Sequence, residues 1–219
     1  MCYKNTGERR MAKLLYIESS PRKERSASIA ISKAFLQEYR ATHPDDEVFV
    51  LDLWKLAMPE FSNEVIDAKY SIMHGKSPSE SQKNAWKAVE DIIAQFKSFD
   101  KYVISLPMWN YGIPYKLKHY IDILVQPGYT FSFSKEQGYK GLVVDKKMLV
   151  IYARGGAYGA ETGAQDFDLQ TRYMNTVLQF IGFQNIQSIL IEPTLASAEM
   201  KEQVMKKAKE EAERLARSY

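Results

Sequence analysis

Five short apolar runs, separated by longer segments with helical spacing, constrain the fold of this 219-residue chain more than any other feature. The runs occupy residues 13–17, 47–51, 102–106, 148–152 and 186–191. Such an alternation is typical of βαβ units, in which helices cross over between parallel strands of one sheet. We therefore predict an α/β fold with a five-stranded parallel sheet and helices on both of its faces.

Two stretches depart from this regular alternation. Residues 77–79 are Ser-Pro-Ser, which interrupts a long helical region and predicts two helices, near residues 63–73 and 80–96. Residues 125–141 are long for a connection and carry four aromatic side chains. We expect that connection to be either a functional flap or a packed excursion from the sheet.

Length and charge place the chain among ordinary single-domain proteins. We predict one domain over residues 11–219, because Met11 offers a second start and strand-like sequence begins at Leu14. Residues 1–10 are expected to be a disordered or non-native tail. A total of 30 Lys and Arg against 27 Asp and Glu leaves a formal net charge of +3. That balance is too even for a dedicated nucleic-acid binder, so we expect no nucleic-acid partner.

Neither membrane insertion nor secretion is indicated by the sequence. No apolar window approaches the ~18 residues of a membrane span, and no apolar signal segment follows the polar residues 1–10. Cys2 is the only cysteine, so no intramolecular disulfide can form, which fits a reducing compartment. We therefore expect a cytoplasmic protein with no membrane partner.

Five strands with intervening helices favour a flavodoxin-like strand order, 2-1-3-4-5. In such a sheet, ligands bind beyond the carboxyl ends of the strands, at the point where the direction of strand addition reverses. That point lies here between the first and third strands. The loops that follow the strands are therefore the places to look for chemistry.

The loop after the first strand has the features of an anion site. It reads Ser-Ser-Pro-Arg-Lys-Glu-Arg-Ser-Ala-Ser over residues 19–28 and leads directly into a helix. A helix start has unpaired N–H groups and partial positive charge, and the serines and Arg22 could bind phosphate oxygens. The alternative is simple capping of the helix by Ser26 or Ser28. The segment lacks both glycine patterns of P-loop NTPases and Rossmann dehydrogenases, which disfavours those two classes.

The loop after the third strand is rich in large aromatic side chains. It reads Pro-Met-Trp-Asn-Tyr-Gly-Ile-Pro over residues 107–114, and its two prolines and glycine restrict its shape. A planar heterocycle needs apolar surfaces on which to stack and a few amide groups at its polar edge, which this loop could supply. The alternative is a packed aromatic corner without a ligand.

The loop after the fourth strand contains a glycine pair. It reads Ala-Arg-Gly-Gly-Ala-Tyr-Gly over residues 153–159, and glycines allow the backbone to approach a ligand closely. The alternative is a flexible turn that faces solvent. A hydroxyl-rich helix start, an aromatic loop and a glycine loop around one crevice together describe a site for flavin mononucleotide (FMN).

From Met11 to its end, the chain resembles the FMN-dependent NADH azoreductases, which are also quinone reductases of the flavodoxin-like superfamily. The matching segments are Ser20 with Ser26-Ala27-Ser28, residues 107–114 with Leu117-Lys118, and Arg154-Gly155-Gly156. The aromatic segment is the most specific of the three. The resemblance implies tightly bound FMN, with NADH or NADPH as electron donor.

The resemblance also implies which residues contact the cofactor. Ser20, Ser26, Ala27 and Ser28 would hold the FMN phosphate. The isoalloxazine ring would be contacted by Met108, Trp109, Asn110 and Tyr111, and its pyrimidine side by Ala153, Arg154, Gly155 and Gly156. Family members often carry Gln at the position of Ala27, Ser at that of Ala153 and Tyr at that of Trp109. Ala27 and Ala153 can therefore offer only backbone groups.

The implied activity is the reduction of quinones and azo compounds by NAD(P)H in a ping-pong cycle. No catalytic triad is required, because the chemistry belongs to the flavin, supported by Asn110 and backbone N–H groups such as that of Gly155. The resemblance further implies a homodimer with active sites at the subunit boundary, where Tyr129, Phe131 and Phe133 would form a substrate wall. Ordinary packing of a long loop is the alternative for these aromatic residues.

Other interpretations remain open at this level. A flavodoxin-type electron carrier is one, although such carriers are usually strongly acidic and this chain has a net charge of +3. A flavin reductase and a scaffold that has lost its cofactor are others. We expect no metal, because the three histidines, His43, His74 and His119, lack metal-ligand spacing. No residue of the sequence separates NADH from NADPH as donor.

Overall fold

Five parallel strands form a single sheet at the centre of the computed structural model, which describes residues 11–73, 76–77 and 79–219. The strands are β1 (Lys13–Glu18), β2 (Glu47–Asp52), β3 (Lys101–Pro107), β6 (Lys147–Ala153) and β7 (Asn185–Ile191). Their order is β2-β1-β3-β6-β7, and each neighbouring pair is parallel. If only the strands of this sheet are numbered along the chain, their order is 2-1-3-4-5, which confirms the prediction. The predicted tail, residues 1–10, lies outside the described residues.

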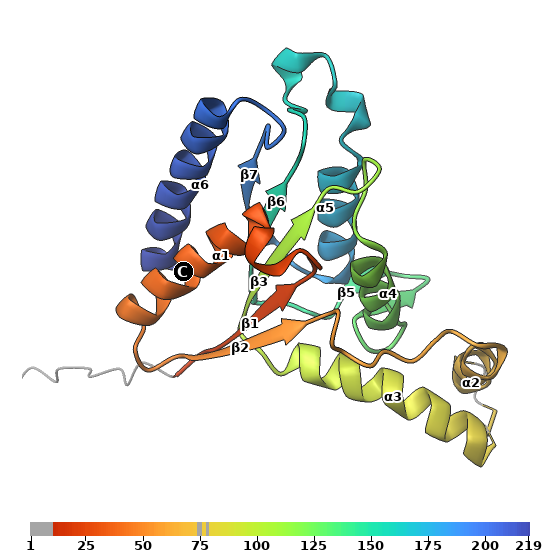
Figure 1. Cartoon of the computed structure of the whole chain (residues 1–219). Coiled ribbons are helices and arrows are strands. Elements are labelled where there is room, and N and C mark those ends of the chain that lie inside the picture. The colour runs from red at the N-terminus through yellow and green to blue at the C-terminus, as the bar shows by residue number, and fades with distance from the viewer. Residues whose placement is uncertain (1–10, 74–75, 78) are drawn as a thin grey trace, which may run out of the picture.

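Helices cover both faces of this sheet, as predicted (Figure 1). One face carries α1 (Ala27–Thr42) and α6 (Ala198–Ser218), and the other carries α3 (Glu80–Lys97), α4 (Tyr115–Leu124) and α5 (Leu169–Ile181). Side chains of a strand alternate between the faces, so Leu14 and Tyr16 pack under α1 while Leu15 and Ile17 join the opposite core. Because both faces are covered, the strands read as nearly continuous apolar runs.

The interruption at residues 77–79 falls between two helices, as predicted. The first, α2, spans Asn63–Met73 and packs against α3. Ser79 caps α3 in a capping box, in which its hydroxyl accepts from the Gln82 backbone and the Gln82 side chain accepts from the Ser79 backbone. Pro78 lies outside the described residues.

The long connection after α4 is a packed excursion. It holds a small antiparallel sheet of β4 (Phe131–Ser134) and β5 (Gly138–Gly141), which the sequence pattern did not predict. Phe131 packs against Phe180 of α5, with 4.7 Å between the ring centroids. At the base of the hairpin, a Cβ on Gly141 would lie 2.4 Å from the Cα of Gly182, so this contact requires a glycine.

None of the helices in the described part of the chain is long and apolar enough to cross a membrane. Within the same residues, no group of three or more His, Cys, Asp or Glu side chains is placed to hold a metal ion.

An ionised carboxylate fixes the amino-terminal edge of the sheet. Asp46 precedes β2 and accepts hydrogen bonds from the Ala12 backbone at 2.9 Å, from the Tyr39 hydroxyl and from Lys101 Nζ at 3.0 Å. Burial opposes ionisation of this side chain, but the three donors outweigh burial and lower the pKa of Asp46 from 3.8 to about 2. The carboxylate thereby ties α1, β1 and β3 together.

Asp46 should make the free energy of unfolding depend on pH. Its folded pKa lies below its unfolded one, so its contribution is complete above about pH 4 and is lost as the pH falls toward 2. We expect Asp46→Asn to lower the free energy of unfolding by about 2 kcal/mol at pH 7 and less at pH 2. Urea unfolding followed by circular dichroism at several pH values checks this. An equal loss at both pH values would contradict it.

Candidate functional site

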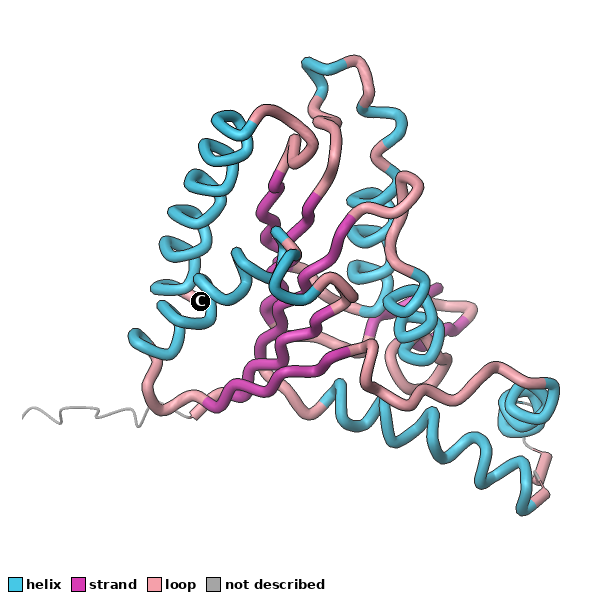
Figure 2. The backbone as a smooth tube through the Cα atoms, viewed as in Figure 1, coloured by secondary structure: helices cyan, strands magenta, loops and turns pink. Residues whose placement is uncertain are grey.

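The predicted loops follow the carboxyl ends of the strands, and Figure 2 shows them in pink along that edge of the sheet. They line a cavity of about 550 Å³ between the first and third strands, together with the segment after β7. Ten of the twelve residues predicted to contact a cofactor line this cavity. Ser28 and Arg154 are the two that do not.

The hydroxyl-rich loop brings the start of α1 to one end of the cavity. Ser26 is the N-cap of α1, and its Oγ accepts from the Ile29 backbone at 3.5 Å and lies 3.2 Å from Ser28 Oγ. Ser26 therefore both caps α1 and lines the cavity. In the described part of the chain, the N–H groups of Ala27 and Ser28 donate to no protein acceptor. These are the open donors of a helix start, which favour an anion.

Lys23 holds this loop in place and does not line the cavity. Its ammonium lies 2.6 Å from both Glu18 and Asp52, at the ends of β1 and β2. Partial burial opposes protonation of Lys23, but the hydrogen bonds to Asp52 and Glu18 outweigh burial and raise its pKa. Lys23 also has a positive φ of 48°, which the two ion pairs help to maintain. We call this group of three residues the Lys23 clamp.

The aromatic loop forms a tight two-residue turn. Trp109 and Gly112 exchange both backbone hydrogen bonds, at 3.1 and 2.9 Å, and the residues between them have positive φ, 47° at Asn110 and 65° at Tyr111. Such turns normally place glycine second, and a tyrosine there costs on the order of 1 kcal/mol. The tyrosine ring is half exposed and tilts against Phe167, 5.3 Å away. Strain at a ligand-facing turn points to a functional role for this side chain.

Trp54, which the sequence analysis did not single out, connects the two loops. Its indole nitrogen donates to the Ser19 carbonyl at 2.9 Å, and its ring lies 6.1 Å from that of Trp109 and 5.4 Å from that of Tyr115. The end of β2 thus positions both the hydroxyl-rich loop and the aromatic turn. A single tryptophan in a loop carries no sequence signal for such a role.

The glycine loop contains an arginine whose side chain points away from the cavity. Arg154 is buried and pairs with Asp168 at 3.1 Å and Glu192 at 3.2 Å, while its Nε donates to Gln170 at 3.1 Å. The Arg154 side chain does not line the cavity, and the contact of this residue with a cofactor stays a prediction. Arg154 instead fixes the loop that carries Gly155, because two carboxylates from separate elements converge on it.

Hydrogen bonds to backbone carbonyls join the aromatic loop, the glycine loop and the segment after β7. Met108 donates to the Ala153 carbonyl at 2.8 Å, and Thr194 donates to the Arg154 carbonyl through both its backbone and its hydroxyl, each at 2.8 Å. The Trp109 N–H donates to the Gly112 carbonyl within its own turn. Within the described residues, the N–H groups of Asn110, Tyr111, Gly155 and Gly156 donate to no protein acceptor. These four groups are available to a bound molecule.

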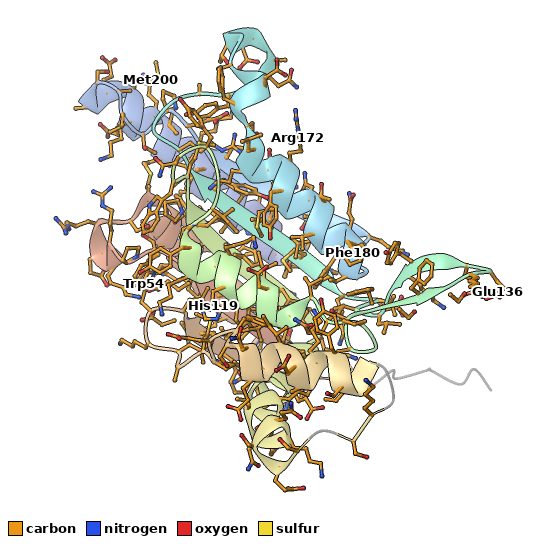
Figure 3. The ribbon with its side chains drawn as sticks, turned by 90° about the vertical axis from the view of Figure 1, so that its right-hand side faces the viewer. Trp54, His119, Glu136, Arg172, Phe180 and Met200 are labelled. Carbon is orange, nitrogen blue, oxygen red and sulfur yellow. The ribbon has the colours of Figure 1, made fainter. Side chains whose placement is uncertain are left out.

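The predicted substrate wall lies elsewhere in the chain. Tyr129 donates to Glu90 at 2.5 Å and accepts from Trp86, and Phe131 packs on α5. Both residues lie at the amino edge of the sheet, because α4 runs back from the carboxyl edge before the hairpin begins. Figure 3 shows Glu136 at the tip of that hairpin, on the opposite side of the molecule from Trp54. Within one chain, neither Tyr129 nor Phe131 lines the cavity.

Five further residues line the cavity that the sequence analysis did not select. They are Arg25, Tyr158, Thr194, Leu195 and Lys201. Arg25 and Tyr158 are in the predicted loops but carried no distinctive pattern. Thr194 follows β7, and its position beside the glycine loop depends on the order of the strands. Lys201 belongs to α6, whose charged sequence is typical of an ordinary solvated helix.

Comparison with known proteins identifies the family. The flavodoxin-like fold matches residues 12–216. The chain belongs to the flavodoxin-like family. An FMN-dependent NADH:quinone oxidoreductase of Desulfotalea psychrophila is 47% identical over 207 residues, which cover 94% of this chain and 97% of that one. A relative of the same description from Nitratidesulfovibrio vulgaris is 46% identical over 210 residues, 95% of this chain and all of that one.

Solved structures in this family superpose closely on the chain. An azoreductase from Bacillus anthracis has a TM-score of 0.87 at 31% identity, covering 95% of this chain and 100% of that one. An FMN-dependent NADH-azoreductase from the same species, in complex with FMN, has a TM-score of 0.83 at 29% identity, covering 94% and 100%.

Removal of the Arg154 guanidinium should destabilise the glycine loop and the chain. Arg154→Met leaves Asp168 and Glu192 without their shared cation, and loss of one member of a buried pair costs on the order of 3 kcal/mol. We expect that loss in the free energy of unfolding in urea, with a smaller loss for Arg154→Lys, which keeps the charge. If the midpoint of urea unfolding of Arg154→Met equalled that of the wild type, the structural role of Arg154 would be refuted.

Proposed function

We propose that this chain is an FMN-dependent NAD(P)H oxidoreductase that reduces quinones and azo compounds. The observation that carries the proposal is the meeting of three different loops at one cavity. A helix start with open N–H groups, a strained aromatic turn and a glycine loop line it together. The named activities of the 46–47% identical relatives support the same conclusion.

The residues present fit FMN at both ends of the cavity. The α1 end offers the open N–H groups of Ala27 and Ser28 and the hydroxyls of Ser20 and Ser26, which suit a phosphate. The opposite end offers aromatic surfaces and four unpaired backbone N–H groups, which suit a flat ring with a polar edge. FMN supplies the electron-transfer chemistry when bound.

The chain's own groups would position and stabilise the ring. The N–H groups of Asn110, Tyr111, Gly155 and Gly156 are fixed donors in a partly enclosed site, where they would stabilise negative charge. Arg154 holds the glycine pair in place and Trp54 holds the aromatic turn. Because these donors are pre-positioned by the fold, they would need no reorganisation during the reaction.

One exposed aromatic surface would receive both substrates in turn. The Tyr111 ring lies 5.3 Å from Phe167 and 6.4 Å from Tyr158, and both Tyr111 and Tyr158 line the cavity. A nicotinamide and a quinone are both flat and both suit such a surface. If they share it, the donor must leave before the acceptor enters, which gives the ping-pong order.

A homodimer in the cytoplasm is part of the proposal. A second, open and mostly apolar cavity of about 680 Å³ lies on the other side of the aromatic turn, between α4 and α5. Gly112, Ile113, Tyr115 and His119 are among the residues that line it. An apolar face of this size beside the cofactor site suits a second copy of the chain. Such a copy could supply Tyr129 and Phe131, whose role as a substrate wall stays a prediction.

Turnover by the purified holoprotein tests the proposed activity. We expect FMN-bound protein to oxidise NADH with menadione or methyl red as acceptor at a rate on the order of 10 s⁻¹. Double-reciprocal plots at several acceptor concentrations should give parallel lines, as a ping-pong order requires. A yellow protein that consumes NADH only with a protein acceptor would instead be an electron carrier, and one that releases reduced flavin would be a flavin reductase.

Two asparagines provide a matched pair for this assay. Asn110→Gly keeps the positive φ of the turn but removes the side-chain amide, and should slow reduction by NADH. Asn185→Ala alters an exposed residue at the start of β7, at the amino edge, and should leave the rate unchanged. Equal rates for both variants would remove the Asn110 side chain from the site.

A further inference from the structure

The positive charge that lines the cavity exceeds what the fold requires. Arg22, Arg25 and Lys201 all line the cavity and are all exposed, and we call them the cation trio. In the described part of the chain, none of the three is within ion-pair distance of a carboxylate. Their side chains are therefore not needed to balance a negative charge within the chain.

Neighbouring charges of the same loop are used differently. Lys23 lies between two trio members in sequence, but its ammonium is neutralised by Glu18 and Asp52. Glu24 pairs with Lys33 of α1 at 2.7 Å, which turns the loop's acidic side chain away from Arg25. Lys23 and Glu24 are therefore both paired away from the cavity. The two arginines of the loop, Arg22 and Arg25, line the cavity.

Two members of the trio are also placed where cations are unfavourable. Arg25 directly precedes the N-cap of α1, and Lys201 lies near the start of α6, whose N-cap is Ser197. Both helix starts carry partial positive charge, so cations there are repelled by the helix dipoles. The two helices pack against each other, and both cations line the same cavity. An anion between them would relieve this repulsion.

We propose that the cation trio is the electrostatic recognition site for the phosphate of FMN, so that the chain selects FMN over riboflavin through salt-sensitive ion pairs. This inference rests on the proposed function. The hydroxyls and N–H groups at the start of α1 provide directional hydrogen bonds to the phosphate oxygens. The trio provides the opposite charge, and its members come from two segments, the loop before α1 and the first turns of α6.

Flavin titrations of the apoprotein separate charge recognition from structure. We expect the double variant Arg25→Gln with Lys201→Gln to bind FMN about tenfold more weakly at low salt, because two charge-assisted contacts are lost. Its affinity for riboflavin, which has no phosphate, should match that of the wild type. Raising the salt concentration should weaken FMN binding to the wild type and narrow the difference between the two proteins. Flavin fluorescence quenching gives each dissociation constant.

A matched control removes two positive charges outside the cavity. Lys33→Gln with Arg217→Gln alters residues paired with Glu24 and Glu38 on the surface. This variant should bind FMN as the wild type does at every salt concentration. Thermal unfolding of each apoprotein, followed by circular dichroism, establishes that the variants are folded to the same extent.

Three results would overturn the inference. In the first, the Arg25 and Lys201 double variant binds FMN as the wild type does, and only its KM for NADPH rises. This result would assign the trio to the nicotinamide donor. Another is an equal loss of affinity for FMN and riboflavin, which would indicate a structural role. A wild-type chain that binds neither flavin would overturn the proposed function as well, and this result is distinct from the other two.

Discussion

The parallel arrangement of β1, β3 and β6 is the constraint on which the site depends. All carboxyl ends of parallel strands lie at one edge, so the loops over residues 19–28, 107–114 and 153–159 must emerge side by side. The reversal of strand addition beside β1 keeps the crossover helices apart at this edge. The cavity exists because that space is lined by loops and is not filled by a helix.

Buried and half-buried ions then fix the shape of those loops. The Lys23 clamp holds the hydroxyl-rich loop against β1 and β2, and Arg154 holds the glycine loop through Asp168 and Glu192. The charge of each of these cations is paired with two carboxylates of the chain itself. Charge that remains at the cavity is consequently available to a ligand, and so are the N–H groups that the turns leave unpaired.

The sequence predicted the sheet and the loops well, because apolar periodicity reports burial directly. The five runs coincide with five strands, and ten selected residues line one cavity. The direction of the Arg154 side chain could not be predicted, since its partners come from distant parts of the chain. The hairpin at residues 131–141 was missed because its four-residue strands carry serine and lysine. Lys201 was missed because only the packing of α6 against α1 brings it near.

A crystal structure of the chain grown with FMN tests the central claim most directly. The account predicts one FMN per chain, with its phosphate at the start of α1 and its ring between the Trp109–Tyr111 turn and Gly155. Density for FMN elsewhere on the molecule, or an FMN whose phosphate points away from Ser26, would contradict it.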